Sequence, residues 1–123
     1  MGQENKNVIN FNEKLKLIKA YWSPKIFASL NDYHFKLVKV KGDFIWHNHQ
    51  NTDEAFIVLS GELRIDYSDH ALTLREGEMH VVKKGIVHKP YAENECSILL
   101  IEPQDTINTG AIVSSKTAKN EWI

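Results

Sequence analysis

Residues 54–67, which read EAFIVLSGELRIDY, decide the fold class of this chain. They contain two short runs of strand-forming residues separated by Gly61, a residue typical of turns. Side chains alternate between the two faces of a strand, so Glu54, Phe56 and Val58 share one face of the first run. The stretch therefore predicts two antiparallel strands joined by a tight turn.

The same pattern of short apolar runs and turn residues continues on both sides of this stretch. The spacing leaves no room for crossover helices, so it describes an all-β sandwich or barrel, and closing the sheet would remove its exposed edges. We expect strands near residues 25–30, 33–41, 44–49, 54–60, 62–67, 71–75, 79–83, 87–91 and 96–102.

Both ends of the chain differ from this β-rich middle. Apolar residues recur at helical spacing from residue 11 onward, which predicts a short helix through Ile18, capped by Asn10 or Asn12. The tail after Pro103 reads as extended or irregular, and we expect it to pack on the barrel or on a partner chain. The expected organisation is an N-terminal arm and short helix over residues 1–21, a barrel over residues 22–103 and a C-terminal tail over residues 104–123.

Composition excludes several classes of protein. A chain of 123 residues can bury a core without stabilisation by a metal or a disulfide. Its charges nearly balance, with 15 Lys and Arg against 16 Asp and Glu, and the basic residues form no stripe, so nucleic acid is not an expected partner. Cys96 is the single cysteine and lies in an apolar run, which predicts a buried, inert thiol in a reducing compartment, the cytoplasm. No apolar run resembles a targeting signal or a membrane span.

Three residues near the middle of the chain have the chemistry of metal ligands. His47 and His49 stand two residues apart in an expected strand, so both rings would lie on the same face and could reach one ion. Glu54 lies five residues further on, at the mouth of an otherwise apolar stripe. An ionised carboxylate there needs a partner because its desolvation is costly, and a cation beside the two imidazoles supplies one.

Two longer motifs resemble those of the cupin family. The first reads HNHQNTDEAFIVLSG over residues 47–61, and the second reads GEMHVVKKGIVH over residues 77–88. The resemblance implies a jelly-roll barrel, an antiparallel double-stranded β-helix. It also implies a divalent metal ion bound by His47, His49, Glu54 and His88, and pairing of the chain as a homodimer.

Such a ligand set leaves one or two positions open on the ion, as a catalytic metal requires. The set suits several transition metals, among them Zn, Ni, Mn and Fe, and does not select one. We therefore expect a metal-dependent enzyme of isomerase, lyase or dioxygenase type that acts on a small oxygenated molecule. The alternative is a non-catalytic module that binds a small ligand or the metal. A stand-alone transcriptional regulator is not expected, because the sequence has no helix-turn-helix pattern.

Several positions have two possible interpretations. Alternation lets either His80 or Met79 face inward, and an inward His80 could orient a substrate or act as a general base. Phe56, Val58 and Ile45 could line a pocket or form core. The outer apolar face of Ala55, Ile57 and Leu59 could be covered by the N-terminal segment or by a second subunit.

We expect no role in the metal site for two further histidines and a group of lysines. We expect His34 and His70 to be hydrogen-bonded or surface residues. The three lysines near the second motif are expected to be solvated turn residues: Lys83, Lys84 and Lys89.

Overall fold

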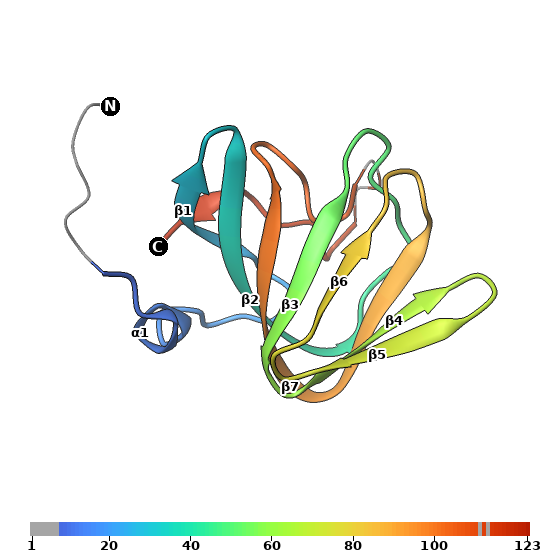
Figure 1. Ribbon diagram of the computed structural model, residues 1–123, viewed down its shortest axis with the longest axis horizontal. Coiled ribbons are helices and arrows are strands. Elements are labelled where there is room, and N and C mark those ends of the chain that lie inside the picture. Colours follow the sequence, from blue (N-terminus) through green and yellow to red (C-terminus); the bar gives the residue numbers. More distant parts are fainter. Residues whose placement is uncertain (1–7, 111, 113) are drawn as a thin grey trace.

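A computed structural model describes residues 8–110, 112 and 114–123, so the start of the expected N-terminal arm, residues 1–7, lies outside the described residues. Figure 1 shows one short helix followed by a bent, strand-rich body. The elements in chain order are α1 (Phe11–Leu15), β1 (Lys25–Leu30), β2 (Tyr33–Asp43), β3 (Glu54–Ser60), β4 (Glu62–Tyr67), β5 (Ala71–Arg75), β6 (Met79–Val82), β7 (His88–Pro103) and β8 (Glu121–Trp122).

The long strand β7 organises the sheet. It pairs antiparallel with β2 along its length, with β3 through its second half and with β4 through its first half. Figure 1 shows how β7 bends between these two partners, so that β4 and β5 lead away from β2 and β3. Among the described residues, β6 pairs only with β3 and β5 only with β4. The sheet therefore folds over on itself without closing, and the prediction that closure removes its exposed edges is wrong.

The expected strand over residues 44–49 is absent. The segment makes a single isolated bridge, between His47 and His88, and otherwise runs as a loop. Pro90 follows two residues after His88 in the facing strand, and its nitrogen has no hydrogen to continue the ladder toward Ile45. The carbonyl of Ile45 instead lies 2.9 Å from Nδ1 of the His47 ring.

Two further boundaries differ from expectation. The strands expected over 87–91 and 96–102 form one strand, β7, which bulges at residues 93–95 opposite the single residue Lys41 of β2. Next to Lys41, Gly42 takes a φ of +81°. The helix α1 ends at Leu15 rather than Ile18. Its cap is Asn10, whose side chain accepts a hydrogen bond from a backbone N–H in the first turn, that of Glu13, at 3.0 Å.

Alternation along the strands separates an inner from an outer apolar cluster. The inner cluster fills the space between the layers and includes Phe56, Val58 and Cys96. Burial raises the pKa of the Cys96 thiol to about 11, so the prediction of an inert cysteine is confirmed. In the outer cluster, Ile57 and Leu59 pack with Ile123 and with three residues of the N-terminal segment: Ile9, Leu15 and Ile18. The N-terminal segment thus covers part of this face.

The C-terminal tail packs against the strands at the end of the barrel where His47 and His49 lie. Its last residues form β8, which pairs in parallel with β1. Earlier in the tail, Gly110 approaches the backbone of Asn48 so closely that a Cβ at this position would lie 2.0 Å from the Asn48 carbonyl oxygen. Only glycine fits there, and the tail therefore lies directly against the loop between His47 and His49.

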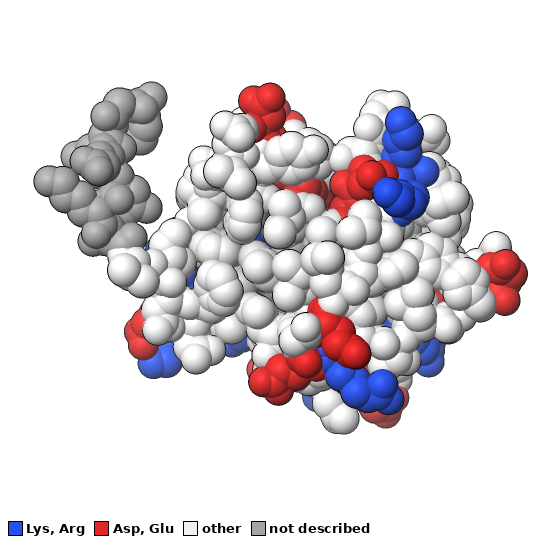
Figure 2. All heavy atoms as spheres, viewed as in Figure 1, with Lys and Arg blue, Asp and Glu red and all other residues white. Residues whose placement is uncertain are grey.

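The charged residues form no large patch of one sign on the face shown in Figure 2. Lysines, arginines and acidic residues lie mostly around its edge, and its centre is uncharged. This distribution agrees with the nearly balanced composition. In the part of the chain that the structure describes, no helix has the length and apolar character needed to cross a membrane.

Candidate metal centre

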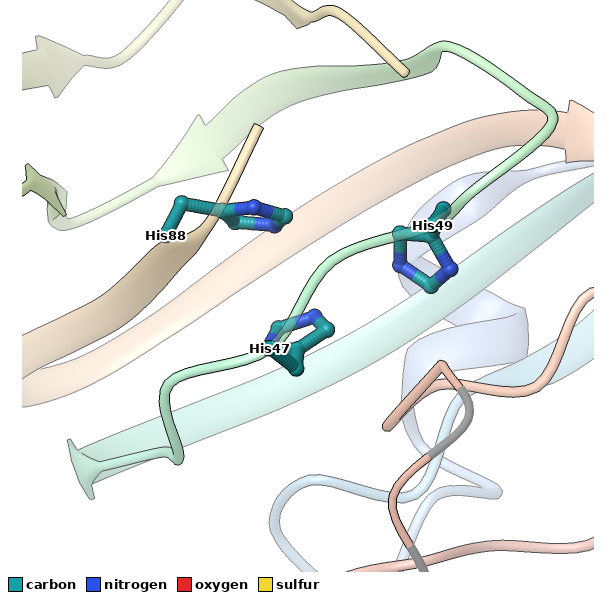
Figure 3. A group of neighbouring side chains, drawn as sticks. All are labelled: His47, His49 and His88. Carbon is teal, nitrogen blue, oxygen red and sulfur yellow. The ribbon is translucent and has the colours of Figure 1, made fainter. Parts of the chain in front are cut away.

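Three imidazoles meet inside one end of the barrel, those of His47, His49 and His88. One ring nitrogen of each lies within 4.8 Å of the corresponding atoms of the other two. Figure 3 shows the rings converging, two from the loop after β2 and the third from the first residue of β7. All three residues are buried. The structure thus brings together three of the four residues that we expected to bind a metal.

The backbone orients two of these rings. Nδ1 of His47 lies 2.9 Å from the carbonyl oxygen of Ile45, and Nδ1 of His88 lies 2.9 Å from that of Ile86. A carbonyl only accepts, so each Nδ1 carries the proton and leaves Nε2 with a free lone pair. Nε2 of His88 and Nε2 of His49 are buried without a hydrogen-bond partner. Unpaired buried nitrogens that face one space are the donors that a metal ion needs, so the three residues fit a metal ion.

Burial keeps the imidazoles neutral. Loss of hydration, with a smaller contribution from the neighbouring His88, lowers the pKa of His47 to about 3. Burial likewise lowers the pKa of His88 to about 4, and it lowers the pKa of His49. Neutral imidazole is the form that binds a metal ion, so at neutral pH the three rings need not lose a proton first.

Glu54, the fourth expected ligand, begins β3 next to His49 but lies outside the group of three. Its Oε1 is 3.4 Å from Nε2 of His49, and its side chain is buried. Two ligand atoms, each about 2.1 Å from one ion at a tetrahedral angle, would lie about 3.4 Å apart, so the contact suits two ligands of the same ion. Burial raises the pKa of the Glu54 carboxyl. Its role as a ligand stays a prediction.

Behind Glu54 lies a buried ion pair that we did not predict from the sequence. Nζ of Lys36 is 2.9 Å from Oε1 of Glu102, and the side chains are 2% and 1% exposed. The same ammonium group donates to the carbonyl of Thr106 at 3.1 Å and to Oδ1 of Asn120 at 2.9 Å. The ammonium group thus makes two hydrogen bonds to the C-terminal tail beside its ion pair with Glu102. Burial and the nearby Glu54 raise the pKa of Glu102 well above its usual value.

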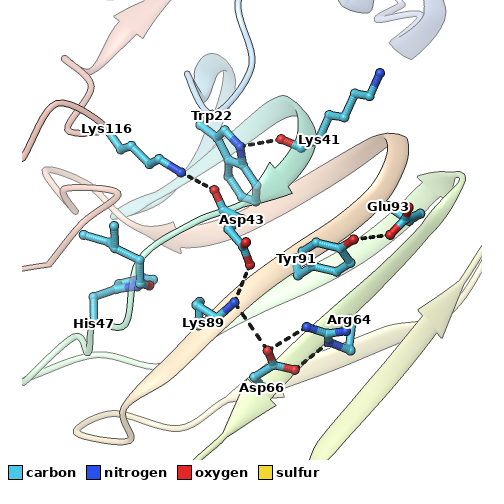
Figure 4. A network of polar contacts seen from close by, with 11 residues as sticks. Trp22, Lys41, Asp43, His47, Arg64, Asp66, Lys89, Tyr91, Glu93 and Lys116 are labelled. Atoms are coloured by element: carbon cyan, nitrogen blue, oxygen red, sulfur yellow. Dashed lines mark hydrogen bonds and ion pairs between the residues drawn. The ribbon is translucent and has the colours of Figure 1, made fainter.

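Outside the barrel, a chain of charged contacts fixes the strands beside the histidines (Figure 4). Lys89 pairs with Asp43 and lies 3.6 Å from Asp66, which in turn pairs with Arg64 at 2.7 Å. Lys116 of the tail donates to the carbonyl of Asp43. These contacts tie together β2, β4, β7 and the tail. Lys89 is thus an ion-pair residue, and the prediction that it is a solvated turn residue is wrong.

A small apolar hollow of about 40 Å³ adjoins the imidazole of His47. Phe56 lines it, whereas Val58 belongs to the closed core and Ile45 does not reach it. The hollow is lined by Trp22, Pro24, Val38, Val40, Phe44, His47, Glu54, Phe56, Pro90, Ile98, Leu100 and Asn108. A ligand there would meet mainly hydrocarbon.

His80 faces inward, which decides between the two orientations left open by the sequence. It stands opposite Phe56 in the ladder between β6 and β3, and its Nε2 lies 2.7 Å from the hydroxyl oxygen of Tyr67. Tyr67 was not among the predicted site residues. The exposed His70 pairs with Asp69, as expected for a surface residue.

His34, by contrast, is buried. Its ring lies edge-on to that of Trp122, with 5.5 Å between centroids, and its Nδ1 has no hydrogen-bond partner among the described residues. The expectation of a hydrogen-bonded or surface residue is therefore wrong at this position. The C-terminal β8, which the sequence did not indicate as a strand, supplies the covering ring.

A folded antiparallel sheet with three converging buried imidazoles defines a small jelly-roll protein with a possible metal site. The chain belongs to the cupin family, since the model of the Cupin domain matches residues 34–102. This match confirms the resemblance found in the two motifs, together with the all-β fold class.

Solved structures and a curated relative agree with this assignment. The chain is 55% identical to a cupin-2 domain containing protein from Shewanella frigidimarina, with a TM-score of 0.78 over 79% of this chain and 95% of the other. Protein NMB1881 from Neisseria meningitidis is 40% identical, with a TM-score of 0.73 over 80% of this chain and all of the other. The uncharacterized protein YdbB of Bacillus subtilis is 38% identical over 63 residues, 50% of this chain and 56% of that protein's length.

The lowered pKa values of His47 and His88 predict how the stability of the metal-free protein depends on pH. In the unfolded chain both rings titrate near their ordinary pKa of 6.5, and in the folded chain at about 3 and about 4. The unfolded state therefore binds more protons between these values, so the stabilising contribution is complete above pH 6.5 and is lost as the pH falls. Denaturant unfolding with a chelator present should show a loss of about 2–4 kcal/mol between pH 7 and pH 5.

The double variant His47→Gln with His88→Gln is the matched control, and its free energy of unfolding should change much less over this interval. Comparing the two proteins separates the effect of the histidines on stability from that of Glu54 and Glu102. The raised pKa values of these two carboxyls increase the free energy of unfolding as the pH falls. Equal pH dependence in the two proteins would contradict the assignment.

Proposed function

We propose that this cupin binds one divalent transition-metal ion through His47, His49, His88 and Glu54. The observation that carries the proposal is that the buried Nε2 atoms of His49 and His88 have no hydrogen-bond partner among the described residues. Leaving such atoms unsatisfied inside a protein costs free energy, and a metal ion would satisfy all of them at once. The 3.4 Å contact between Glu54 and His49 supports the carboxylate as the fourth ligand.

Three neutral imidazoles and one carboxylate suit Zn, Ni, Mn or Fe, and relative affinity and supply decide which of them is loaded. With these four ligands the ion would retain one or two open positions for a further ligand. When bound, it would polarise an oxygen atom of a ligand or activate dioxygen. The protein's own part is to orient the imidazoles through the carbonyls of Ile45 and Ile86 and to surround the ligand with hydrocarbon.

We further propose that the bound ion serves an enzyme acting on a small oxygenated molecule, in an isomerase, lyase or dioxygenase type of reaction. The hollow supports this proposal, because two of the expected ligands, His47 and Glu54, are among the residues that line it. A non-catalytic module that binds a small ligand or the metal is the alternative. Both functions use the same site, so they differ only in whether the ligand is converted.

The expected homodimer and the expected cytoplasmic location stay predictions. The homodimer is supported by the exposed part of the outer apolar face, where Tyr33 and Met79 are 48% and 61% exposed. The cytoplasmic location is supported by the single, buried Cys96.

Metal content tests the proposed site. Protein purified without an affinity tag, stripped and then dialysed against excess Zn²⁺, should retain about one ion per chain by elemental analysis. His47→Ala and His88→Ala should retain less than a tenth of that amount, because each removes a nitrogen ligand. Glu54→Gln keeps the shape of the side chain and weakens the fourth bond, so its zinc affinity should fall roughly 10- to 100-fold.

The matched control is His70→Ala, which removes an exposed histidine and should retain the wild-type amount of zinc. Equal zinc content in the wild type, His47→Ala and His88→Ala would refute the site.

Turnover distinguishes the enzyme from the binding module. Protein loaded separately with each of the four metals is assayed against a panel of sugar phosphates, diketones and hydroxy acids. An enzyme should convert at least one compound, and this activity should be lost in His88→Ala. Tight binding of a panel member without conversion of any would favour the binding module.

A further inference from the structure

Tyr67 and His80 form a polar pair near the imidazoles, and neither residue lines the apolar hollow. Tyr67 ends β4 and His80 lies in β6, two strands that do not pair with each other. Their side chains meet across the open edge of the sheet, with the hydroxyl oxygen 2.7 Å from Nε2. Neither residue is among the expected metal ligands.

This pair lies next to His88. Tyr67 stands opposite His88 in the ladder between β4 and β7, and the two ring centroids are 6.4 Å apart. His80 stands opposite Phe56, whose ring is edge-on to that of His88 at 6.3 Å. Tyr67 and His80 are both only partly buried, so a ligand can approach them.

The hydrogen bond inside the pair leaves capacity for a ligand. If the phenol donates to His80, the Tyr67 oxygen keeps a lone pair that accepts a hydrogen bond. If the imidazole donates instead, the phenol O–H is free to donate. The pair can therefore meet either a hydroxyl or a carbonyl oxygen.

Two other polar side chains near the site, Asn108 and Lys36, already have partners. The amide of Asn108, which lines the hollow, donates to the carbonyls of Trp22 and Lys116 and accepts from the backbone N–H of Ala118. Buried Lys36 pairs with Glu102 and donates to Thr106 and Asn120. A ligand with two oxygens would therefore find one partner in the metal ion and the other in Tyr67 with His80.

We propose that Tyr67 and His80 form a second anchoring point for small ligands that carry oxygens on neighbouring atoms, such as 2-hydroxy acids, 2-oxo acids and hydroxamates. One oxygen binds the metal ion, the other hydrogen-bonds the pair, and the rest of the molecule extends toward the hydrocarbon lining. This inference rests on the proposed metal site and deepens it by naming the ligand class.

Cobalt-loaded protein tests the proposal, because the visible spectrum of Co²⁺ reports both occupancy of the site and binding of a further ligand. The probe is acetohydroxamate, which carries oxygens on adjacent atoms. Thiocyanate is the control probe, since it contains no oxygen. Wild type is compared with Tyr67→Phe and His80→Leu. Tyr91→Phe is the matched control, because it removes a hydroxyl from a tyrosine whose partner is Glu93 on the outer surface.

All four proteins should take up one equivalent of Co²⁺ with the same spectrum. Tyr67→Phe should bind acetohydroxamate roughly five- to tenfold more weakly, the effect of losing one hydrogen bond. His80→Leu should change in the same direction. Thiocyanate affinity should stay unchanged in every variant, and Tyr91→Phe should match the wild type for both probes.

Each failure has its own signature. Wild-type acetohydroxamate affinity in Tyr67→Phe and His80→Leu, accompanied only by a lower unfolding midpoint, would show that the pair merely joins β4 to β6, and would overturn the inference while the metal site stands. Cobalt-loaded wild type that binds thiocyanate but not acetohydroxamate would overturn the ligand class. Absence of cobalt uptake by the wild type would overturn the proposed function and this inference together.

Discussion

Polar groups buried at one end of an otherwise apolar barrel impose the constraint that shapes this molecule. Three imidazoles, two carboxyls and one ammonium group lie where water is largely excluded. An unpaired charge or an unsatisfied polar atom in such a place costs several kcal/mol. The ammonium of Lys36 pairs with Glu102 and donates to Thr106 and Asn120. The Nε2 atoms of His49 and His88 and both carboxyl oxygens of Glu102 have no hydrogen-bond partner among the described residues, and a bound cation is the partner that would satisfy the two imidazoles.

The C-terminal tail follows from the same constraint. Lys36 cannot be satisfied by the strands alone, and two of its three acceptors come from residues after β7. The tail also lies against the loop between His47 and His49, where the contact of Gly110 with Asn48 admits no side chain. Lys116 joins the tail to the outer ion pairs through Asp43. The tail thus contacts the buried Lys36 behind the candidate metal centre and the ion pairs on the outer surface beside it.

Much of the β-structure could be predicted from local pattern, because alternation and turn residues are short-range signals. The strands at 25–30, 54–60, 62–67 and 71–75 lie where expected. The 44–49 segment does not, since its pairing depends on Pro90, a residue more than forty positions away. His47 and His49 therefore converge from a loop, although the argument for them assumed a strand. His88 was found only through resemblance, as nothing in its neighbourhood marks it as a ligand.

The missed residues show where sequence reasoning ends. Lys36 and Glu102 occupy inward positions, two residues from Val38 and Leu100 respectively, and strict alternation could have identified them as buried charges. Tyr67 could not have been found in this way. Its role depends on contact across two strands that do not pair, and only the three-dimensional arrangement brings it to His80.

X-ray absorption of the protein loaded with one equivalent of Zn²⁺ tests the central claim most directly, because it reports the atoms around the ion itself. The proposed site predicts three imidazole nitrogens and a carboxylate oxygen at about 2.0–2.2 Å from the ion. A spectrum dominated by oxygen ligands without imidazole scattering would contradict it.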